Sequence, residues 1–428
     1  MIIYSEFCTP RLEYTLNLVF SRILGLGYSI ITSFDITQNE SELLINYSNS
    51  DIKNSVKILP SGLLSENFLK QHDKKNGNFE GLPTIYHSGK GDIPFDIFSA
   101  IFYMVSRYEE YLPFEGDVHG RFRAEESLAY KYGFHRLPVV ELWCKLLADK
   151  LGIAFPDQPV KVLPTIDIDN AWKYKNKGFF RTVGGIFKSL LKMDLSSLRE
   201  KIAVISGKMS DPADNYAYLE EIGSKTDCTV QYFILAGSRG KNDRAIPIGN
   251  KQFRKLLVRL NQKKSVGLHP SYRSFGSEKE LEKEYLSLCS VFTNKITKSR
   301  QHYLLLKFPG TYRNLIKLGI REDYSIGWGS QAGFRAGISR PFPFYDLLAE
   351  KQTHLMLVPF VAMDRTLKDY MKLTPDEAIS LLDQLKEYTK QIGGWFVLLW
   401  HNDSIGDTGE WKGWRPVFEK SLGYGEIN

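Results

Sequence analysis

From residue 160 to the end of the chain, short apolar runs alternate with amphipathic stretches. The runs are typical of buried strands, and the stretches carry apolar residues at the three- and four-residue spacing of helices. The runs are VKVLPTID (160–167), CTVQYFIL (228–235), SVGLH (265–269), HYLLLKF (302–308), HLMLVPF (354–360) and GWFVLLWH (394–401). The expected helices are 253–263, 278–292, 311–319 and 375–392, the last opened by Thr374 and Pro375. Repeated strand–helix units predict a parallel sheet or barrel.

The first 155 or so residues lack this rhythm and mix short strands with helices. Residues 152–159 (GIAFPDQP) have the glycine and proline content of a boundary. A chain of 428 residues also exceeds what one apolar core usually supports. We therefore expect an α/β protein with a smaller N-terminal α+β domain over 1–157 and a strand–helix domain over 158–428.

Polar residues close several of the apolar runs, where a strand should open into a loop. Chemistry in parallel α/β folds gathers at the carboxyl ends of the strands, so we expect these side chains to converge. They are Asp167, Asp169, His269 and His401. Arg300 and His302 break the pattern because they precede their run.

This set of residue types suits a metal or acid/base site. Two carboxylates two residues apart on a strand share one face, and burying both is unfavourable without a cation or a shared proton. One carboxylate oxygen with imidazole nitrogens is typical of zinc sites for hydrolysis. A second carboxylate would act as base and a further histidine as acid. Single histidines are more often packing residues, a role we assign to His72, His87, His119, His135 and His354.

Composition narrows the possible partners. The net charge of +7 is spread over many short groups, with a locally basic tract at 172–193, and no nucleic-acid reader motif accompanies it. We expect a solvated face and no nucleic-acid partner. The four cysteines lie far apart and form no metal-binding or disulfide pattern. No apolar stretch is long enough to span a membrane and the N-terminus is a poor signal peptide, so we expect a cytoplasmic protein.

The order of these residues resembles the polysaccharide deacetylase family, carbohydrate esterase family 4 (NodB homology), as a divergent branch over about 160–428. The resemblance implies a distorted (β/α) barrel that removes N-acetyl groups from amino sugars. The family's first motif, Thr-Phe-Asp-Asp-Gly, is similar to TIDID (165–169). The general base of the family then falls on Asp167, and its metal-binding aspartate is displaced by one residue to Asp169.

The second family motif, His-x-x-x-His, resembles HPSYR (269–273), where His269 matches the first metal ligand and Arg273 stands in the place of the second. The third motif resembles SRQHY (299–303). By this resemblance Arg300 orients the base, and His302 is our candidate for the replacement ligand.

The fourth motif, which lines the substrate groove in the family, resembles EDYSIGW (322–328), and the fifth resembles LLWH (398–401). The resemblance makes His401 the proton donor to the leaving amine, with Asp403 or a carboxylate from another loop raising its pKa. GFRAG (333–337) resembles a sub-branch encoded with surface-polysaccharide machinery. The expected substrate-binding residues are Tyr272, Trp328, Arg335, Trp400 and Asn402, although a structural salt bridge is the alternative for Arg335 and packing the alternative for Trp328.

These observations predict a metal-dependent deacetylase that acts on amino sugars of a surface polysaccharide or its precursor. The expected metal is zinc, held by Asp169, His269 and His302, and water is the nucleophile. Because Arg273 occupies a ligand position, the alternative is an inactive carbohydrate-binding protein. A third possibility, cleavage of a glycosidic bond, needs a partner carboxylate on another strand end, which is not evident. DVHGRF (117–122) and its surroundings resemble an uncharacterised domain that implies no function.

Overall fold

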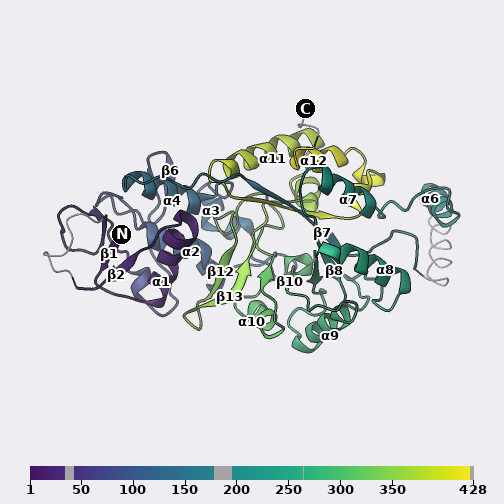
Figure 1. Cartoon of the computed structure of the whole chain (residues 1–428), viewed down its shortest axis with the longest axis horizontal. Coiled ribbons are helices and arrows are strands. Elements are labelled where there is room, and N and C mark those ends of the chain that lie inside the picture. The colour runs from purple at the N-terminus through teal and green to yellow at the C-terminus, as the bar shows by residue number, and fades with distance from the viewer. Residues whose placement is uncertain (34–42, 178–194, 264, 425–428) are drawn as a thin grey trace.

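A computed structural model describes residues 1–33, 43–177, 195–263 and 265–424 (Figure 1). It has a mixed α/β architecture. The N-terminal elements gather at one end of the molecule, and a large sheet with its helices fills the middle and the other end. Among the helices of these residues, none combines the length and the apolar character that a membrane crossing requires. Most of the basic tract, residues 178–193, lies outside the described residues.

The N-terminal region contains a small parallel sheet in the order β2-β1-β3-β4 and a β5–β6 hairpin. Its strands are β1 (Ile2–Ser5), β2 (Ser29–Ile31), β3 (Leu44–Tyr47), β4 (Val56–Lys57), β5 (Gly77–Phe79) and β6 (Leu82–Thr84). Its helices are α1 (Pro10–Leu16), which continues as a π-helix over Asn17–Leu24, α2 (Ile97–Val105), α3 (Leu128–Lys131) and α4 (Val139–Lys150).

The large sheet has the order β12-β13-β11-β10-β9-β8-β7-β15-β14 and is parallel except for the β12–β13 pair. Its strands are β7 (Lys161–Ile168), β8 (Gln231–Leu235), β9 (Val266–His269), β10 (Lys298–Ser299), β11 (Glu322–Asp323), β12 (Phe342–Asp346), β13 (Lys351–Leu357), β14 (Ala362–Met363) and β15 (Trp395–His401). The helices that accompany it are α6 (Leu195–Ile205), α7 (Tyr216–Lys225), α8 (Lys251–Leu260), α9 (Glu278–Cys289), α10 (Gly310–Lys317), α11 (Pro375–Lys390) and α12 (Arg415–Ser421). The expected strand–helix alternation is therefore confirmed, except for the run at 302–308.

The register of the sheet brings the polar strand ends to one edge. His401 of β15 lies opposite Asp167 of β7, and His269 of β9 lies opposite Leu235 of β8. Because these strands are parallel, their carboxyl ends share one rim.

The sheet curls strongly. Strands β13 and β14 lie near opposite ends of the strand order, yet only residues 358–361 join them. Within this link Val358 donates its N–H to Asp323 O (2.8 Å) of β11, and Val361 donates its N–H to Val397 O (2.8 Å) of β15. The chain from β13 to β14 is thus hydrogen-bonded to β11 at one end and to β15 at the other. Among the described residues, the two edge strands β12 and β14 do not pair with each other.

Alternation along the strands gives the curled sheet an inside and an outside. Leu163, Phe233 and Val397 belong to a small buried cluster that also contains Val358 and Phe360 of the link. Their strand neighbours pack into the larger core, which also contains residues of the flanking helices. Asp167 has the same parity as Leu163 and therefore points toward the inside.

The expected strand at 302–308 is wrong. The strand in this part of the chain is β10 (Lys298–Ser299), and residues 302–304 form a tight turn in which Tyr303 and Leu304 have φ angles of 57° and 56°. Such positive φ values end any strand. Arg300 and His302 consequently follow a strand end, as the other polar site residues do.

Buried polar contacts join the N-terminal region to the rest of the chain. Arg335 binds both oxygens of Glu110 (3.0 and 2.6 Å), and Arg11 binds Glu350 (Nε to Oε2, 3.0 Å). A single apolar core contains residues from both parts of the chain. The proposed boundary at residue 157 falls in the extended segment between α4 and β7.

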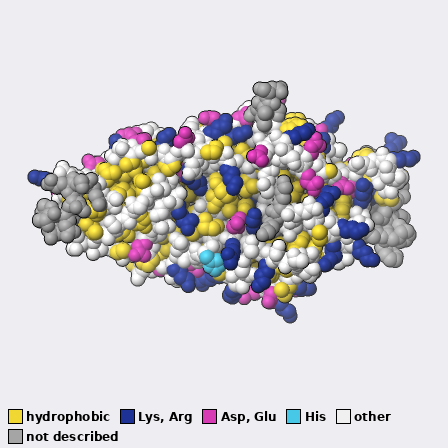
Figure 2. Space-filling view, in the orientation of Figure 1, with side chains coloured by type: hydrophobic (Ala, Val, Ile, Leu, Met, Phe, Trp, Pro, Cys, Tyr) yellow, Lys and Arg dark blue, Asp and Glu magenta, His cyan; other side chains and the backbone are white. Residues whose placement is uncertain are grey.

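Charged side chains are distributed over the visible surface. On the face in Figure 2, Lys and Arg are interspersed with Asp and Glu rather than gathered into one patch.

Helix α11 begins where the sequence predicted a helix start. Thr374 and Glu377 form a capping box there.

Candidate metal and acid/base site

The end of β7 carries a buried carboxylate held by an arginine. Arg300, which is fully buried, donates from Nη1 to Asp167 Oδ1 (3.0 Å) and to Thr165 Oγ1 (2.6 Å). Its Nε donates to Tyr324 O (3.0 Å), and its guanidinium lies 4.6 Å from the centroid of the Phe233 ring. Arg300 is thereby fixed, and it holds Asp167 in one orientation at the rim.

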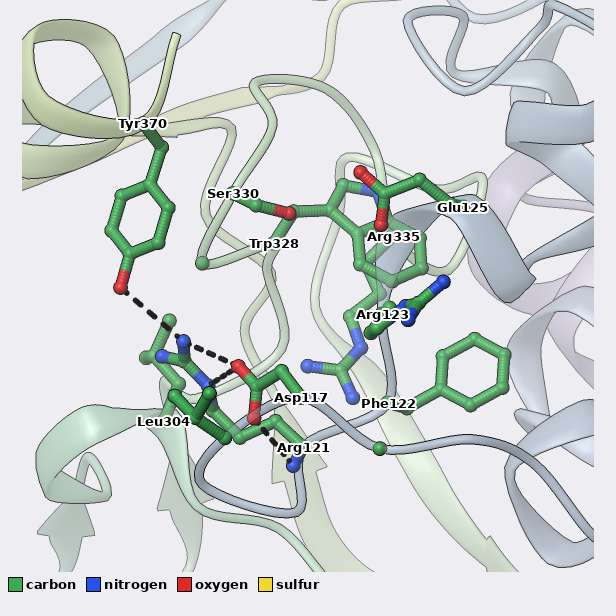
Figure 3. Close-up of a pocket in the computed structure, with 13 residues that line it drawn as sticks. Asp117, Arg121, Phe122, Arg123, Glu125, Leu304, Trp328, Ser330, Arg335 and Tyr370 are labelled. Carbon is green, nitrogen blue, oxygen red and sulfur yellow. Dashed lines mark hydrogen bonds and ion pairs between the residues drawn. The ribbon is translucent and has the colours of Figure 1, made fainter.

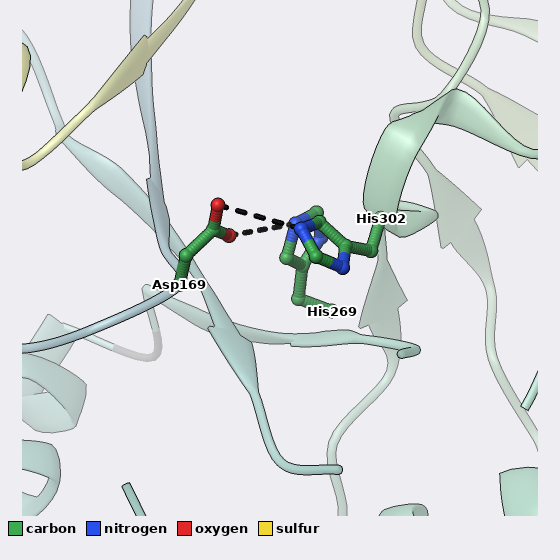
Figure 4. A group of neighbouring side chains, drawn as sticks. All are labelled: Asp169, His269 and His302. Atoms are coloured by element: carbon green, nitrogen blue, oxygen red, sulfur yellow. Dashed lines mark ion pairs between the residues drawn. The ribbon is translucent and has the colours of Figure 1, made fainter. Parts of the chain in front are cut away.

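Three side chains meet beside Asp167. His269 Nε2 lies 3.3 Å from Asp169 Oδ1, and His302 Nε2 lies 3.4 Å from Asp169 Oδ2. One ligand atom from each residue can be chosen so that all three lie within 4.8 Å of one another. Figure 4 shows both imidazoles turned toward the carboxylate. The structure brings together the three residues that the sequence proposed as ligands.

Hydrogen bonds on the far side of each ring determine which nitrogen faces Asp169. His269 Nδ1 lies 2.6 Å from Arg300 O, and His302 Nδ1 lies 2.9 Å from Asp243 Oδ1. Since a carbonyl and a carboxylate only accept, both Nδ1 atoms are the donors, and Nε2 of a neutral ring keeps its lone pair. Metal-binding histidines in proteins commonly donate one ring N–H to a carbonyl or carboxylate in this way, which orients the other nitrogen toward the metal.

Two further properties of the site suit a bound cation: buried polar atoms that lack hydrogen-bond partners, and an environment that favours positive charge. Asp169 Oδ1 and His269 Nε2 are buried and have no hydrogen-bond partner within the described residues. Burial lowers the pKa of His302, but the carboxylates of Asp169 and Asp243 outweigh it and raise the pKa to about 9. Positive charge is therefore favoured here. The donor set of one oxygen and two nitrogens suits zinc.

Asp243, in the loop after β8, was not predicted from the sequence. Its Oδ1 accepts from Tyr272 N (2.8 Å) as well as from His302, and its Oδ2 accepts from Arg273 N (3.3 Å). It thus connects His302 to the turn that follows His269. The Arg273 side chain itself is exposed, so the residue that replaces the second motif histidine does not fill the site.

We expect Asp243→Asn to weaken divalent-metal binding by about 10- to 100-fold, because an amide can present its NH₂ rather than an acceptor to His302 Nδ1. Isothermal titration with Zn²⁺ measures this. Asp211→Asn is the matched control, since Asp211 is an equally buried carboxylate that accepts instead from the N–H groups of Lys173 and Tyr174. Equal affinities in the two variants would contradict the role of Asp243.

His401, at the end of β15, is paired with a carboxylate that sequence reasoning also missed. Its Nδ1 donates to Asp364 Oδ1 (2.9 Å), and its N–H donates to Asp364 Oδ2 (2.8 Å). Burial opposes the charge, but Asp364 raises the pKa of His401 to about 10. Asp403, the suggested partner, is half exposed and lies 3.6 Å from Arg365. Asp364 directly follows β14, so the strand-end rule could have found it.

Of the expected substrate-binding residues, the structure places Tyr272 at the rim, where its ring lies 5.2 Å from that of Tyr303. The others are buried. Trp328 stacks on Phe122, Arg335 is bound to Glu110, Trp400 packs on Phe418, and Asn402 donates to Ala213 O and Asn170 O. These contacts favour structural roles for Arg335, Trp400 and Asn402.

A pocket of about 390 Å³ lies between the rim and the N-terminal region (Figure 3). Leu304, two residues after His302, forms part of its wall. The other lining residues from the rim include Trp328, Ser330 and Tyr370, and those from the N-terminal region include Asp117, Arg121, Arg123 and Glu125. The buried Trp328 Nε1 has no hydrogen-bond partner within the described residues.

Comparisons with known families and curated proteins add little information on function. A family of unknown function (DUF7033) matches residues 1–156. A comparison with curated proteins finds no match.

Several solved structures are similar to part of the chain. A protein from Mycobacterium smegmatis described as a polysaccharide deacetylase has 15% identity and a TM-score of 0.41, over 64% of this chain and 88% of its own. A polysaccharide deacetylase from Bacillus cereus has 12% identity and a TM-score of 0.31, over 62% and 87%. A mutant of a CE4 family pseudoenzyme has 14% identity and a TM-score of 0.28, over 63% and 65%. At such low values the likeness assigns no activity to this chain.

Proposed function

We propose that this protein is a metal-dependent hydrolase that removes N-acetyl groups from amino sugars of a surface polysaccharide or its precursor. The observation that carries the proposal is the convergence of three ligand atoms of Asp169, His269 and His302 on one point. A separately held base and acid lie on the neighbouring strands β7 and β15. A divalent cation at this point, zinc being the first candidate, would acidify a water molecule and stabilise negative charge on the amide oxygen.

Asp167 is the proposed general base. Arg300 and its own burial hold the carboxylate in place, and its Oδ2 lies 3.6 Å from His269 Nε2, so it borders the cation site. From there it accepts the proton of the attacking water. Water is the nucleophile, and no covalent intermediate is required.

His401 is the proposed general acid. Its side chain is 16% exposed at the rim, whereas Asp364 behind it is fully buried. The raised pKa keeps the ring protonated at neutral pH, so it is ready to donate a proton from Nε2 to the departing amine. Asp364 fixes the ring through Nδ1 and leaves Nε2 free for this transfer.

The adjoining pocket supports a carbohydrate substrate. Aromatic side chains and planar charged groups line it together, and such groups bind the ring faces and hydroxyls of sugars. Leu304, which lies two residues after His302 in the chain, lines this pocket, so we assign the pocket to a sugar unit beside the one that is deacetylated.

We expect the purified protein to hold about one divalent ion per chain and to release acetate from N-acetylglucosamine oligomers without forming new reducing ends. Elemental analysis, an enzymatic acetate assay and a reducing-end assay measure the three quantities. Removal of the metal with a chelator should abolish acetate release, and added Zn²⁺ should restore it. New reducing ends without acetate would contradict the proposal and indicate glycosidic cleavage.

A second candidate, an inactive carbohydrate-binding protein, is favoured by Arg273 at the position of a family metal ligand. This candidate predicts binding of the same oligomers without acetate release at any metal concentration. It also predicts that Asp167→Asn changes neither the absence of acetate release nor the affinity for the oligomers.

A further inference from the structure

A short segment of the N-terminal region reaches the turn that carries His302. In this strap, residues 117–121, Asp117 Oδ1 accepts from the N–H groups of His119 (2.8 Å) and Arg121 (3.0 Å). Asp117 Oδ2 accepts from Arg121 Nε (2.7 Å). The carboxylate thus holds the strap in a compact loop and orients the Arg121 guanidinium toward the rim, as Figure 3 shows.

Arg121 also contacts the rim, although its Nη2 lies 2.6 Å from Asp117 Oδ2 as well. Its Nη1 donates to Tyr303 O (3.0 Å), and its Nη2 donates to Tyr370 OH (3.3 Å). The Arg121 side chain is only 11% exposed, although it belongs to the N-terminal region. It therefore binds the backbone of the residue directly after His302.

The turn at this point has an unfavourable backbone. Tyr303 and Leu304 both adopt positive φ, at 57° and 56°, although neither is glycine. Side chains with a Cβ rarely take this conformation, and two in succession require contacts from outside the turn. The strap supplies such contacts, because the His119 ring also packs edge-on against Tyr303 (4.9 Å), which in turn packs on His302 (4.7 Å).

We propose that the strap holds the His302 turn in its ligand geometry, with Arg121 as a positioning residue, so that the N-terminal region completes the metal site. The inference rests on the proposed metal site. It gives a role to a region whose sequence implied none.

Zn²⁺ and Co²⁺ titrations of the full chain test the proposal. We expect Arg121→Ala to bind both ions about tenfold or more weakly and to change the visible spectrum of bound Co²⁺, because one ligand is less well placed. Arg121→Lys, which keeps the charge beside Asp117, should recover part of the affinity. Arg123→Ala is the matched control, since Arg123 lies two residues away and approaches carboxylates only at 3.7 Å.

A second variant leaves Arg121 in the chain. A Cβ on Gly329 would come within 2.9 Å of Arg121 Nη1, and that nitrogen is the far end of a flexible side chain. Gly329→Ala should therefore displace the guanidinium without disturbing the fold, and we expect it to weaken metal binding in the same direction as Arg121→Ala. Wild-type affinity in both variants would overturn the proposal.

Hydrogen exchange on the metal-free protein separates this inference from the proposed function. The N–H groups of Leu304 and Leu305 are bonded within the turn, to Gln301 O and His302 O. We expect Arg121→Ala to speed exchange of these amides at least about tenfold. If the wild type binds no metal, the proposed function fails, but faster exchange in Arg121→Ala would still show that the strap holds the turn. Unchanged exchange overturns the strap whatever the metal result.

Discussion

Replacing Asp169 by asparagine is expected to reduce divalent-metal affinity at least about 100-fold and acetate release on the order of 1,000-fold. Both carboxylate oxygens face the Nε2 atom of a histidine, at 3.3 and 3.4 Å. Asparagine keeps the size of the side chain but removes its charge and turns one acceptor into a donor. Partial burial would raise the pKa of Asp169, but His302 and His269 outweigh it and lower this pKa well below its ordinary range, so the wild-type residue is ionised.

Asp167→Asn provides the matched comparison. Asp167 is bound to Arg300 rather than placed between the two imidazoles. We expect this variant to lose acetate release to a similar degree while it keeps metal affinity within a fewfold of wild type. Titration with Zn²⁺ and the acetate assay together separate the two roles. Equal loss of metal in both variants would show that the assignment of ligand and base is wrong.

Asp364→Asn should lower kcat about 100-fold above neutral pH. A general acid works only while protonated, so activity falls as pH rises through its pKa. In the wild type Asp364 raises the pKa of His401 to about 10, and activity should persist into alkaline solution. Without the carboxylate the pKa of His401 falls, so the alkaline limb of the profile should move to lower pH.

The pH–rate profile of kcat measures this shift, and Asp403→Asn is the control. Asp403 is the carboxylate that lies two residues from His401 in the chain, but its contact is with Arg365. We expect the Asp403→Asn profile to match the wild type. If the profile shifted in Asp403→Asn and not in Asp364→Asn, Asp403 rather than Asp364 would be the carboxylate that raises the pKa of His401.

The rule that polar residues gather at the ends of parallel strands predicted much of the site. It placed Asp167, Asp169, His269 and His401 at one rim, and the register of β7, β8, β9 and β15 brings them there. These strands are long or strongly apolar, so their pattern decides the structure. The mixed α/β architecture followed from the same pattern.

The failures have physical causes. The run HYLLLKF is apolar enough for a strand, but periodicity cannot show that Tyr303 and Leu304 take a left-handed conformation. Asp243 lies in a loop with no apolar run to mark it, and only its contact with His302 makes it relevant. His119 packs as expected, but its partner Tyr303 lies in a distant part of the sequence that no local pattern relates to it.

The buried ion pairs between the two parts of the chain limit how the protein can be divided. Expression of residues 158–428 alone would leave Arg335 without Glu110 and Glu350 without Arg11, in a surface stripped of its apolar cover. The apolar side chains that pack against residues 1–157 would then face solvent, so such a fragment would need polar replacements at those positions before it could fold without aggregating. Crystallography and engineering of residues 158–428 therefore have to begin from a chain that includes residues 1–157.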